Sequence, residues 1–113
     1  MDCIFCSIIK GEIPSNTVYE DDMIKAFYDI EPQAPKHIII IPKEHIKSSA
    51  DITEENAKYV SHIFTKIPEI AKSEGIKDSG FRVITNCGRD GGQTVGHLHF
   101  HLLGGRDLGA KLV

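Results

Sequence analysis

The chain has 113 residues, of which 41% are hydrophobic and 26% are charged, and its formal net charge at pH 7 is −3. This length predicts a single domain over residues 1–113, with a core large enough to fold without disulfide bonds. The acidic balance and the scattered Lys and Arg residues argue against nucleic-acid binding, and no apolar run approaches the roughly 20 residues of a membrane span.

The N-terminus and the cysteine content predict the compartment. Met1 and Asp2 are not followed by the basic and apolar segments of a signal peptide. The chain has three cysteines, an odd number that argues against a disulfide framework. We therefore expect a cytoplasmic protein with reduced thiols and no membrane association.

The order of the predicted elements indicates an α+β fold. Apolar residues at helical spacing predict a short helix over residues 3–10, and strands are predicted over residues 17–20, 23–30 and 37–42. A long amphipathic helix is predicted to begin at Asp51, with Glu54 as its capping-box partner, and to end at Gly75. Strands over residues 81–86 and 97–103 follow, on either side of a glycine-rich loop. We expect about five antiparallel strands, one long helix and one short helix.

The last predicted strand has histidines at alternate positions, His97, His99 and His101. The two-residue period of a strand places the three imidazoles on one face and the apolar residues between them on the other. Alternate residues of a strand lie roughly 6.5–7 Å apart, so the outer two histidines are too far apart for one ion to bind all three. The spacing favours separate roles, with His99 as a nucleophile and its neighbours tuning it or binding charge.

The loop before these histidines, from Asn86 to Thr94, contains several glycines together with amide and hydroxyl side chains. Glycine allows the backbone to approach an anion closely, and successive N–H groups form anion-binding concavities. This mixture suits a phosphate, although a glycine-rich loop on its own is equally consistent with a simple turn.

Residues 97–103 match the signature of the histidine triad family at every position, since the three histidines alternate with apolar residues. Residues 29–37, 41–45 and 91–97 resemble the nucleotide-binding branch of that family, which hydrolyses nucleoside phosphoramidates. The resemblance covers nearly the whole chain and implies a HIT-like fold and a homodimer whose sheets join. It implies a purine nucleoside phosphoramidate hydrolase that acts on AMP- or GMP-amines through a covalent nucleotidyl-histidine intermediate.

The same resemblance implies roles for individual residues. His99 matches the nucleophile that attacks the α-phosphorus, His101 contacts the phosphate, and Asp29 binds the ribose. His97 and His37 support and orient the centre, and no metal is needed for the chemistry. The residues that match the apolar base pocket are Phe5, Ile8, Phe27, Ile30 and Ile39, and those on the phosphate side are Asn86, Gly92 and Thr94, with the Thr94 hydroxyl able to protonate the leaving amine.

Cys3 and Cys6 have the spacing of half a zinc site. Some bacterial members of the family, which this chain resembles, hold zinc with two such cysteines, a histidine after the Ile-Pro-Lys segment and the first triad histidine. The implied ligands are Cys3, Cys6, His45 and His97, in a closed structural site that fixes the N-terminal helix to the sheet. The alternative is that both cysteines are small buried hydrophobic residues.

Two other functions stay open on the sequence. The alternative enzyme is a dinucleoside polyphosphate hydrolase. The alternative that is not primarily an enzyme is a nucleotide-binding, zinc-stabilised interaction protein with incidental activity. The tail after Gly105 lacks the Trp-Pro-Pro-Gly ending of the animal relatives, so the preference for the amine portion stays open as well.

Overall fold

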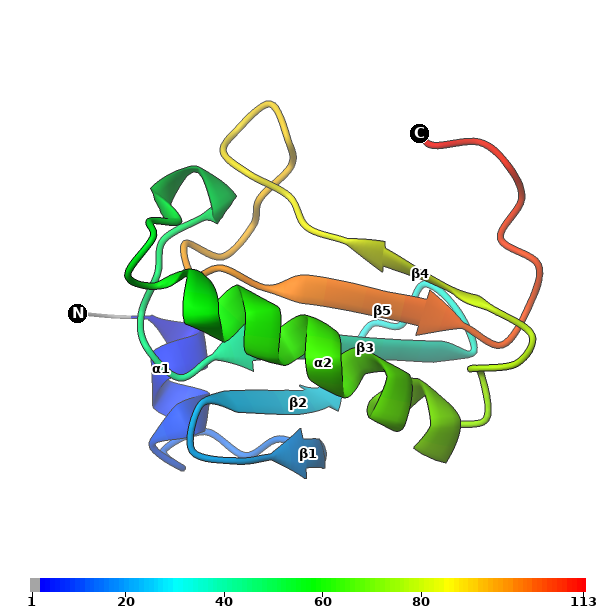
Figure 1. Ribbon diagram of the computed structural model, residues 1–113, viewed down its shortest axis with the longest axis horizontal. Helices are drawn as coiled ribbons and strands as arrows, with labels where there is room; N and C mark the ends of the chain where they lie inside the picture. The colour runs from blue at the N-terminus through cyan, green and yellow to red at the C-terminus, as the bar shows by residue number, and fades with distance from the viewer. Residues whose placement is uncertain (1–2) are drawn as a thin grey trace.

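The computed structural model describes residues 3–113 and has an α+β architecture. Its five strands form one antiparallel sheet in the order β1-β2-β3-β5-β4 (Figure 1). This confirms the expected class, with one short and one long helix. The elements are α1 (Ile4–Ile9), β1 (Thr17–Glu20), β2 (Ile24–Tyr28), β3 (Lys36–Pro42), the 3-10 turn η1 (Ser49–Asp51), α2 (Ala57–Ser73), β4 (Phe81–Ile84) and β5 (Phe100–Gly104). Among the described residues, no helix has the length and apolar character needed to cross a membrane.

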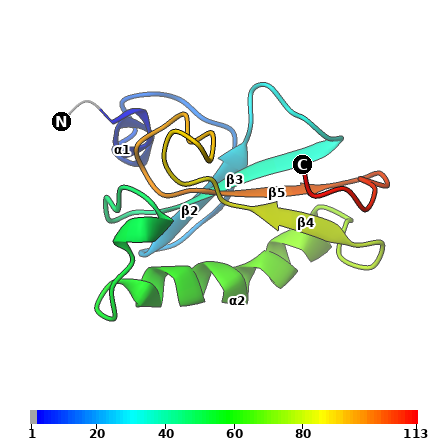
Figure 2. The ribbon, with the colours of Figure 1, turned by 90° about the horizontal axis from the view of Figure 1, so that it is seen from above.

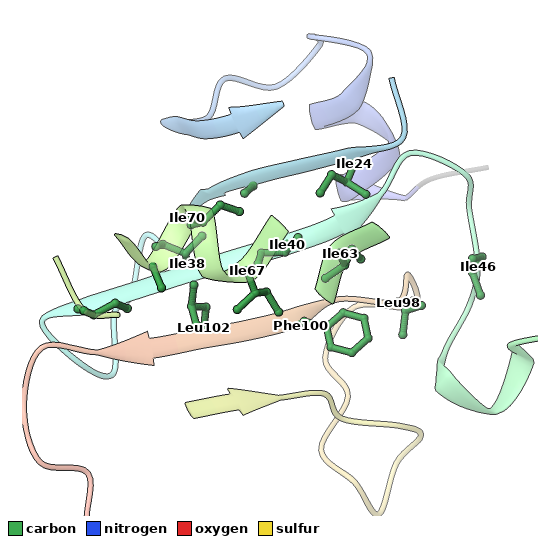
Figure 3. Close-up of a cluster of buried hydrophobic side chains, with 13 residues drawn as sticks. Ile24, Ile38, Ile40, Ile46, Ile63, Ile67, Ile70, Leu98, Phe100 and Leu102 are labelled. Atoms are coloured by element: carbon green, nitrogen blue, oxygen red, sulfur yellow. The ribbon is translucent and has the colours of Figure 1, made fainter. Parts of the chain in front are cut away.

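The two helices cover opposite faces of the sheet (Figure 2). Figure 3 shows isoleucines of α2 against the sheet, in a cluster that includes Ile38, Ile40 and Leu102. Burying each of these side chains stabilises the fold by roughly 1.5–3 kcal/mol. The alternate residues of β3, Ile39 and Ile41, belong to a second cluster with Phe5 of α1. Because both faces of β3 are covered, its sequence is a continuous apolar run rather than an alternating one.

The long helix begins later than predicted. Asp51 lies in η1, where its carboxylate accepts a hydrogen bond from the Ser48 hydroxyl at 2.7 Å, and α2 starts at Ala57. The reciprocal bonds of a capping box form instead between Thr53 and Asn56, each backbone N–H donating to the other side chain at 2.7 and 3.2 Å. The predicted capping pair of Asp51 and Glu54 was therefore wrong, because Thr53 and Asn56 have the same spacing and lie nearer the helix.

The last strand also begins later than predicted, at Phe100 rather than His97. Before Phe100 the chain leaves the sheet ladder and bonds a loop, with the N–H of Leu98 donating to the carbonyl of Ile46 at 2.6 Å. The predicted alternation nevertheless holds, because Leu98, Phe100 and Leu102 all lie in the core beneath α2. The histidines between them are thus directed away from that core.

Candidate active site

The candidate active site lies on the sheet face opposite α2. His101 of β5 pairs with Ile39 of β3, and His37 lies two residues before Ile39 on the same strand. The imidazoles of His37 and His101 approach to 2.8 Å between Nε2 and Nδ1. Antiparallel pairing thereby brings together two histidines that are 64 residues apart in the chain.

One ring nitrogen of His99 is fixed by a hydrogen bond to the main chain. Its Nδ1 lies 2.7 Å from the backbone carbonyl of His97. A carbonyl only accepts hydrogen bonds, so Nδ1 carries the hydrogen and Nε2 keeps a lone pair. The ring of Phe5 packs edge-on against this imidazole, with centroids 5.1 Å apart. His99 is buried and held in one orientation, which suits a nucleophilic nitrogen.

The imidazoles of His37 and His101 are neutral at pH 7. Burial lowers the pKa of His101 to about 4, and the nearby His99 and His37 add to this effect. Burial also lowers the pKa of His37, although Asp29, whose Oδ2 lies 3.4 Å from His37 Nε2, opposes the shift in part. A neutral histidine can donate from one nitrogen and accept at the other, so both rings are suited to hydrogen bonding rather than ion pairing.

A cavity of about 380 Å³ lies between α1 and the β2 and β3 strands. Its apolar wall contains Phe5, Ile8, Phe27 and Ile39, four of the five residues predicted for a base pocket, and each of these is buried. The fifth, Ile30, also lines the cavity but is 91% exposed, so it lies at the rim.

Asp29 lines the same cavity, and its Oδ1 accepts the Glu31 N–H at 2.8 Å. The pocket therefore combines an apolar wall with one half-buried carboxylate. The sequence prediction missed the segment between α1 and β1, of which Ile13, Pro14, Ser15 and Asn16 line the cavity. Pro14 is the one local signal in this segment, and a proline there indicates the end of a helix rather than a pocket wall.

The glycine-rich loop is held by a residue that was not predicted. The Gln93 side chain accepts the N–H of Gly88 at 2.9 Å and donates to the carbonyls of Lys47 and Val95 at 2.8 and 2.9 Å. The amide of Asn86 donates to the carbonyl of Gly91 at 2.7 Å, so it stabilises the loop itself. Gly92 adopts a φ of 77°, and Thr94 is exposed. Asn86, Gly92 and Thr94 thus share one loop just before His97.

Four predicted metal ligands converge between α1 and the sheet. The Sγ of Cys3 lies 3.3 Å from His97 Nδ1, the Sγ of Cys6 lies 3.3 Å from His45 Nδ1, and the two Nδ1 atoms are 3.1 Å apart. All four ligand atoms lie within 4.8 Å of one another. Ligand atoms around tetrahedral zinc are about 3.3–3.8 Å apart, given Zn–N of about 2.0–2.1 Å and Zn–S of about 2.3 Å.

The surroundings of this cluster fit a cation. His97 Nε2 lies 2.9 Å from the Pro42 carbonyl and must donate to it, which leaves the Nδ1 lone pair directed at the cysteines. Burial, with Cys3 beside it, raises the pKa of the Cys6 thiol, so an ion is what would stabilise the thiolates here. The cluster can hold a metal, and the His97 imidazole is one of its four possible ligands.

The comparisons of this chain with known proteins agree with one another. A family model described as "Scavenger mRNA decapping enzyme C-term binding" matches residues 2–110. The "Purine nucleoside phosphoramidase" of Escherichia coli is 49% identical over 111 residues, which are 98% of this chain and 93% of the relative. A HIT family hydrolase from Clostridium thermocellum superposes with a TM-score of 0.97 at 50% identity, covering 99% of this chain and 97% of the other. A histidine triad protein from Clostridium difficile gives 0.95 at 54% identity, with 98% and 96% covered.

Proposed function

This chain belongs to the histidine triad (HIT) family of hydrolases, and we propose that it hydrolyses the phosphorus–nitrogen bond of purine nucleoside phosphoramidates. The observation that carries the proposal is the fixed tautomer of His99, whose Nδ1 is bonded to the His97 carbonyl. This nucleophile lies against Phe5, which also lines a cavity suited to a nucleoside. The name of the Escherichia coli relative supports the same substrate class.

Substrate binding follows from the two kinds of surface in the cavity. The apolar wall around Phe5 and Phe27 receives a purine base, because flat aromatic and branched side chains bury a heterocycle without needing its hydrogen bonds. Asp29 accepts hydrogen bonds from the ribose hydroxyls with its carboxylate. This division favours a nucleotide over a simple phosphate ester.

The first chemical step forms a covalent intermediate. The Nε2 lone pair of His99 attacks the α-phosphorus, and the bond to the amine nitrogen breaks with its electron pair. The Thr94 hydroxyl gives its proton to that nitrogen. The imidazole becomes positively charged, and the His97 carbonyl stabilises it through the Nδ1 hydrogen bond, which strengthens as charge develops.

The second step returns the enzyme to its starting state. Water gives a proton to the Thr94 oxygen and attacks phosphorus, and the bond to His99 Nε2 breaks with its pair returning to the imidazole. The products are a nucleoside monophosphate and the free amine. Splitting one displacement into two lowers each barrier, and His101 donates to the phosphoryl oxygens in both steps.

We also propose that Cys3, Cys6, His45 and His97 hold a structural zinc ion. Two thiolates and two imidazoles complete a tetrahedral shell with no open position, as in structural rather than catalytic sites. The ion would fix α1, which supplies Phe5 and Ile8 to the base pocket, against the sheet.

The chain is further proposed to be a single domain over residues 1–113 and a cytoplasmic homodimer whose sheets join. The two edges of the sheet are β1 and β4. β4 begins with Phe81, whose side chain is partly exposed, whereas the ends of β1 are Thr17 and Glu20. The β4 edge is therefore the one proposed for the contact between subunits.

Replacing His99 with Ala tests the enzymatic function. We expect turnover of an AMP-amine to be abolished, while AMP binding measured by calorimetry is retained, because the cavity and Asp29 are unchanged. His62→Gln, on α2, is the control and should turn over the substrate at the wild-type rate. Unchanged turnover in the His99 variant, or faster wild-type cleavage of a dinucleoside polyphosphate assayed beside the AMP-amine, would contradict the proposal.

A further inference from the structure

We propose that the backbone amide of Gln33 is a positioning group that sets the tautomers of His37 and His101, so that His101 presents an N–H donor at Nε2. The role of this donor toward a phosphoryl oxygen rests on the proposed function. The tautomers themselves do not depend on it.

The chain of hydrogen bonds has only one consistent direction. The Gln33 N–H donates to His37 Nδ1 at 3.0 Å, so Nδ1 must hold a lone pair. In a neutral imidazole the hydrogen then sits on Nε2, which lies 2.8 Å from His101 Nδ1. His101 Nδ1 accepts it and must carry its own hydrogen on Nε2. A main-chain donor thus determines the state of a side chain in the active site two hydrogen bonds away.

The surrounding groups keep this arrangement in place. Among residues 3–113, the one carboxylate that contacts His37 is Asp29, whose Oδ2 lies 3.4 Å from Nε2, farther than His101 Nδ1 at 2.8 Å. The other oxygen of Asp29 accepts the Glu31 N–H, which fixes the carboxylate. Gln33 itself follows Pro32, and its side-chain amide donates to the Glu31 carbonyl at 3.3 Å. Proline fixes its own φ and restricts the residue before it, so the segment that leads into the Gln33 amide has little backbone freedom.

The same bond disfavours metal binding by a second group of metal-ligand side chains. The ligand atoms of Asp29, His37 and His101 lie within 4.8 Å of one another, as do those of Cys3, Cys6, His45 and His97. Coordination through His37 Nε2 would need a lone pair there and a hydrogen on Nδ1, which would face the Gln33 N–H. At His97 the hydrogen-bond partner of Nε2 is the Pro42 carbonyl, which requires a hydrogen on Nε2 and leaves the Nδ1 lone pair for an ion. The hydrogen-bond partner of each ring, an N–H at His37 and a carbonyl at His97, therefore decides whether the imidazole is suited to hydrogen bonding or to metal binding.

Removing the amide hydrogen tests the proposal. Gln33→Pro deletes the donor, and Gln33→Ala keeps it and is the matched control. Long-range 1H–15N spectra of the histidine rings report each tautomer directly. We expect the wild type and the Ala variant to show His37 and His101 with hydrogen on Nε2 at pH 7, and the Pro variant to show mixed tautomers. Loss of one ordered donor should lower kcat/KM for an AMP-amine about tenfold in the Pro variant only.

The wild-type spectrum keeps the proposal falsifiable if the Pro variant does not fold. Hydrogen on His101 Nδ1 in the wild type would overturn it, and so would a Pro variant with unchanged tautomers. His37→Ala removes the intermediate donor and should give mixed tautomers at His101; a fixed Nε2 hydrogen there would also overturn it. Absence of phosphoramidate turnover with the expected wild-type tautomers would count against the proposed function alone.

Discussion

At the residue scale, His97 makes three kinds of contact through three different atoms. Its carbonyl accepts from His99 Nδ1, its Nε2 donates to Pro42, and its Nδ1 faces the sulfurs of Cys3 and Cys6. Only the first of these contacts reaches the proposed nucleophile, and it is made by the main chain. The imidazole and the reaction centre are therefore separable by substitution.

His97→Ala is predicted to remove the metal while retaining most of the activity. The variant loses one of four ligands but keeps the carbonyl that orients His99, so kcat should remain within about tenfold of the wild type. Metal content, measured by elemental analysis of the purified protein, should fall, and the melting temperature should fall with it, because metal binding stabilises the folded state. His99→Ala is the matched variant and should show the reverse, with metal retained and turnover lost.

Two results would count against this assignment. Wild-type protein purified without metal, and unable to take up zinc on titration, would contradict the proposed zinc site. A His97→Ala variant as inactive as His99→Ala, although folded, would show that the imidazole acts in the chemistry.

At the element scale, Asp21 joins the turn between β1 and β2 to the long helix. Its carboxylate accepts the backbone N–H groups of Met23 and Ile24 at 2.8 and 3.0 Å, the Tyr19 hydroxyl at 2.7 Å, and contacts His62 Nε2 of α2 at 2.6 Å. Burial alone would raise the pKa of Asp21, but these bonds, that from His62 first, hold it well below its usual range. His62 had no predicted role, because contact across 41 residues leaves no periodic signal.

Asp21→Asn is predicted to lower stability in a pH-dependent way. The pKa of Asp21 is lower in the folded than in the unfolded state, so its charge stabilises the fold above the ordinary carboxyl pKa near 4. That contribution is lost as the pH falls toward the lowered pKa. We expect the variant to be about 1–3 kcal/mol less stable at pH 7, by urea unfolding, with the difference shrinking below about pH 4. Asp22→Asn, at the exposed neighbour, is the control; a deficit equal at pH 7 and pH 3 would contradict the prediction.

The elements show how far local patterns determine this structure. The six-residue helix α1, the strand of isoleucines β3 and the alternation around His99 were predictable, because each follows the period of its own residues. The start of α2 was not predictable, because Asp51 and Thr53 are both suitable capping residues and only the packing of η1 distinguishes them. Within the site, the convergence of Cys3, Cys6, His45 and His97 followed from a resemblance, whereas the Gln33 bond depends on loop geometry that no spacing encodes.

At the scale of the whole molecule, one edge of the sheet differs from the other. β4 has four residues and pairs only with β5 among the described strands, so its outer N–H and C=O groups are available to another strand. Phe81 at its start is 36% exposed, and Phe64 of α2, which packs edge-on against Phe100, is 48% exposed. Burying both rings on a two-fold axis would give an interface in which each subunit contributes the same surface.

Phe81→Glu is therefore predicted to convert a dimer into a monomer. At the contact between subunits, each Glu carboxylate would lose its water and face the same carboxylate of the other subunit. Like charges in contact oppose association. Sedimentation at micromolar concentration should give twice the chain mass for the wild type and a single chain mass for the variant. Ile4→Glu, at a half-exposed position on α1, is the control and should remain dimeric, because α1 lies on the opposite face from α2. A wild-type chain that sediments as a monomer, or a Phe81→Glu variant that stays dimeric, would exclude the β4 edge as the contact.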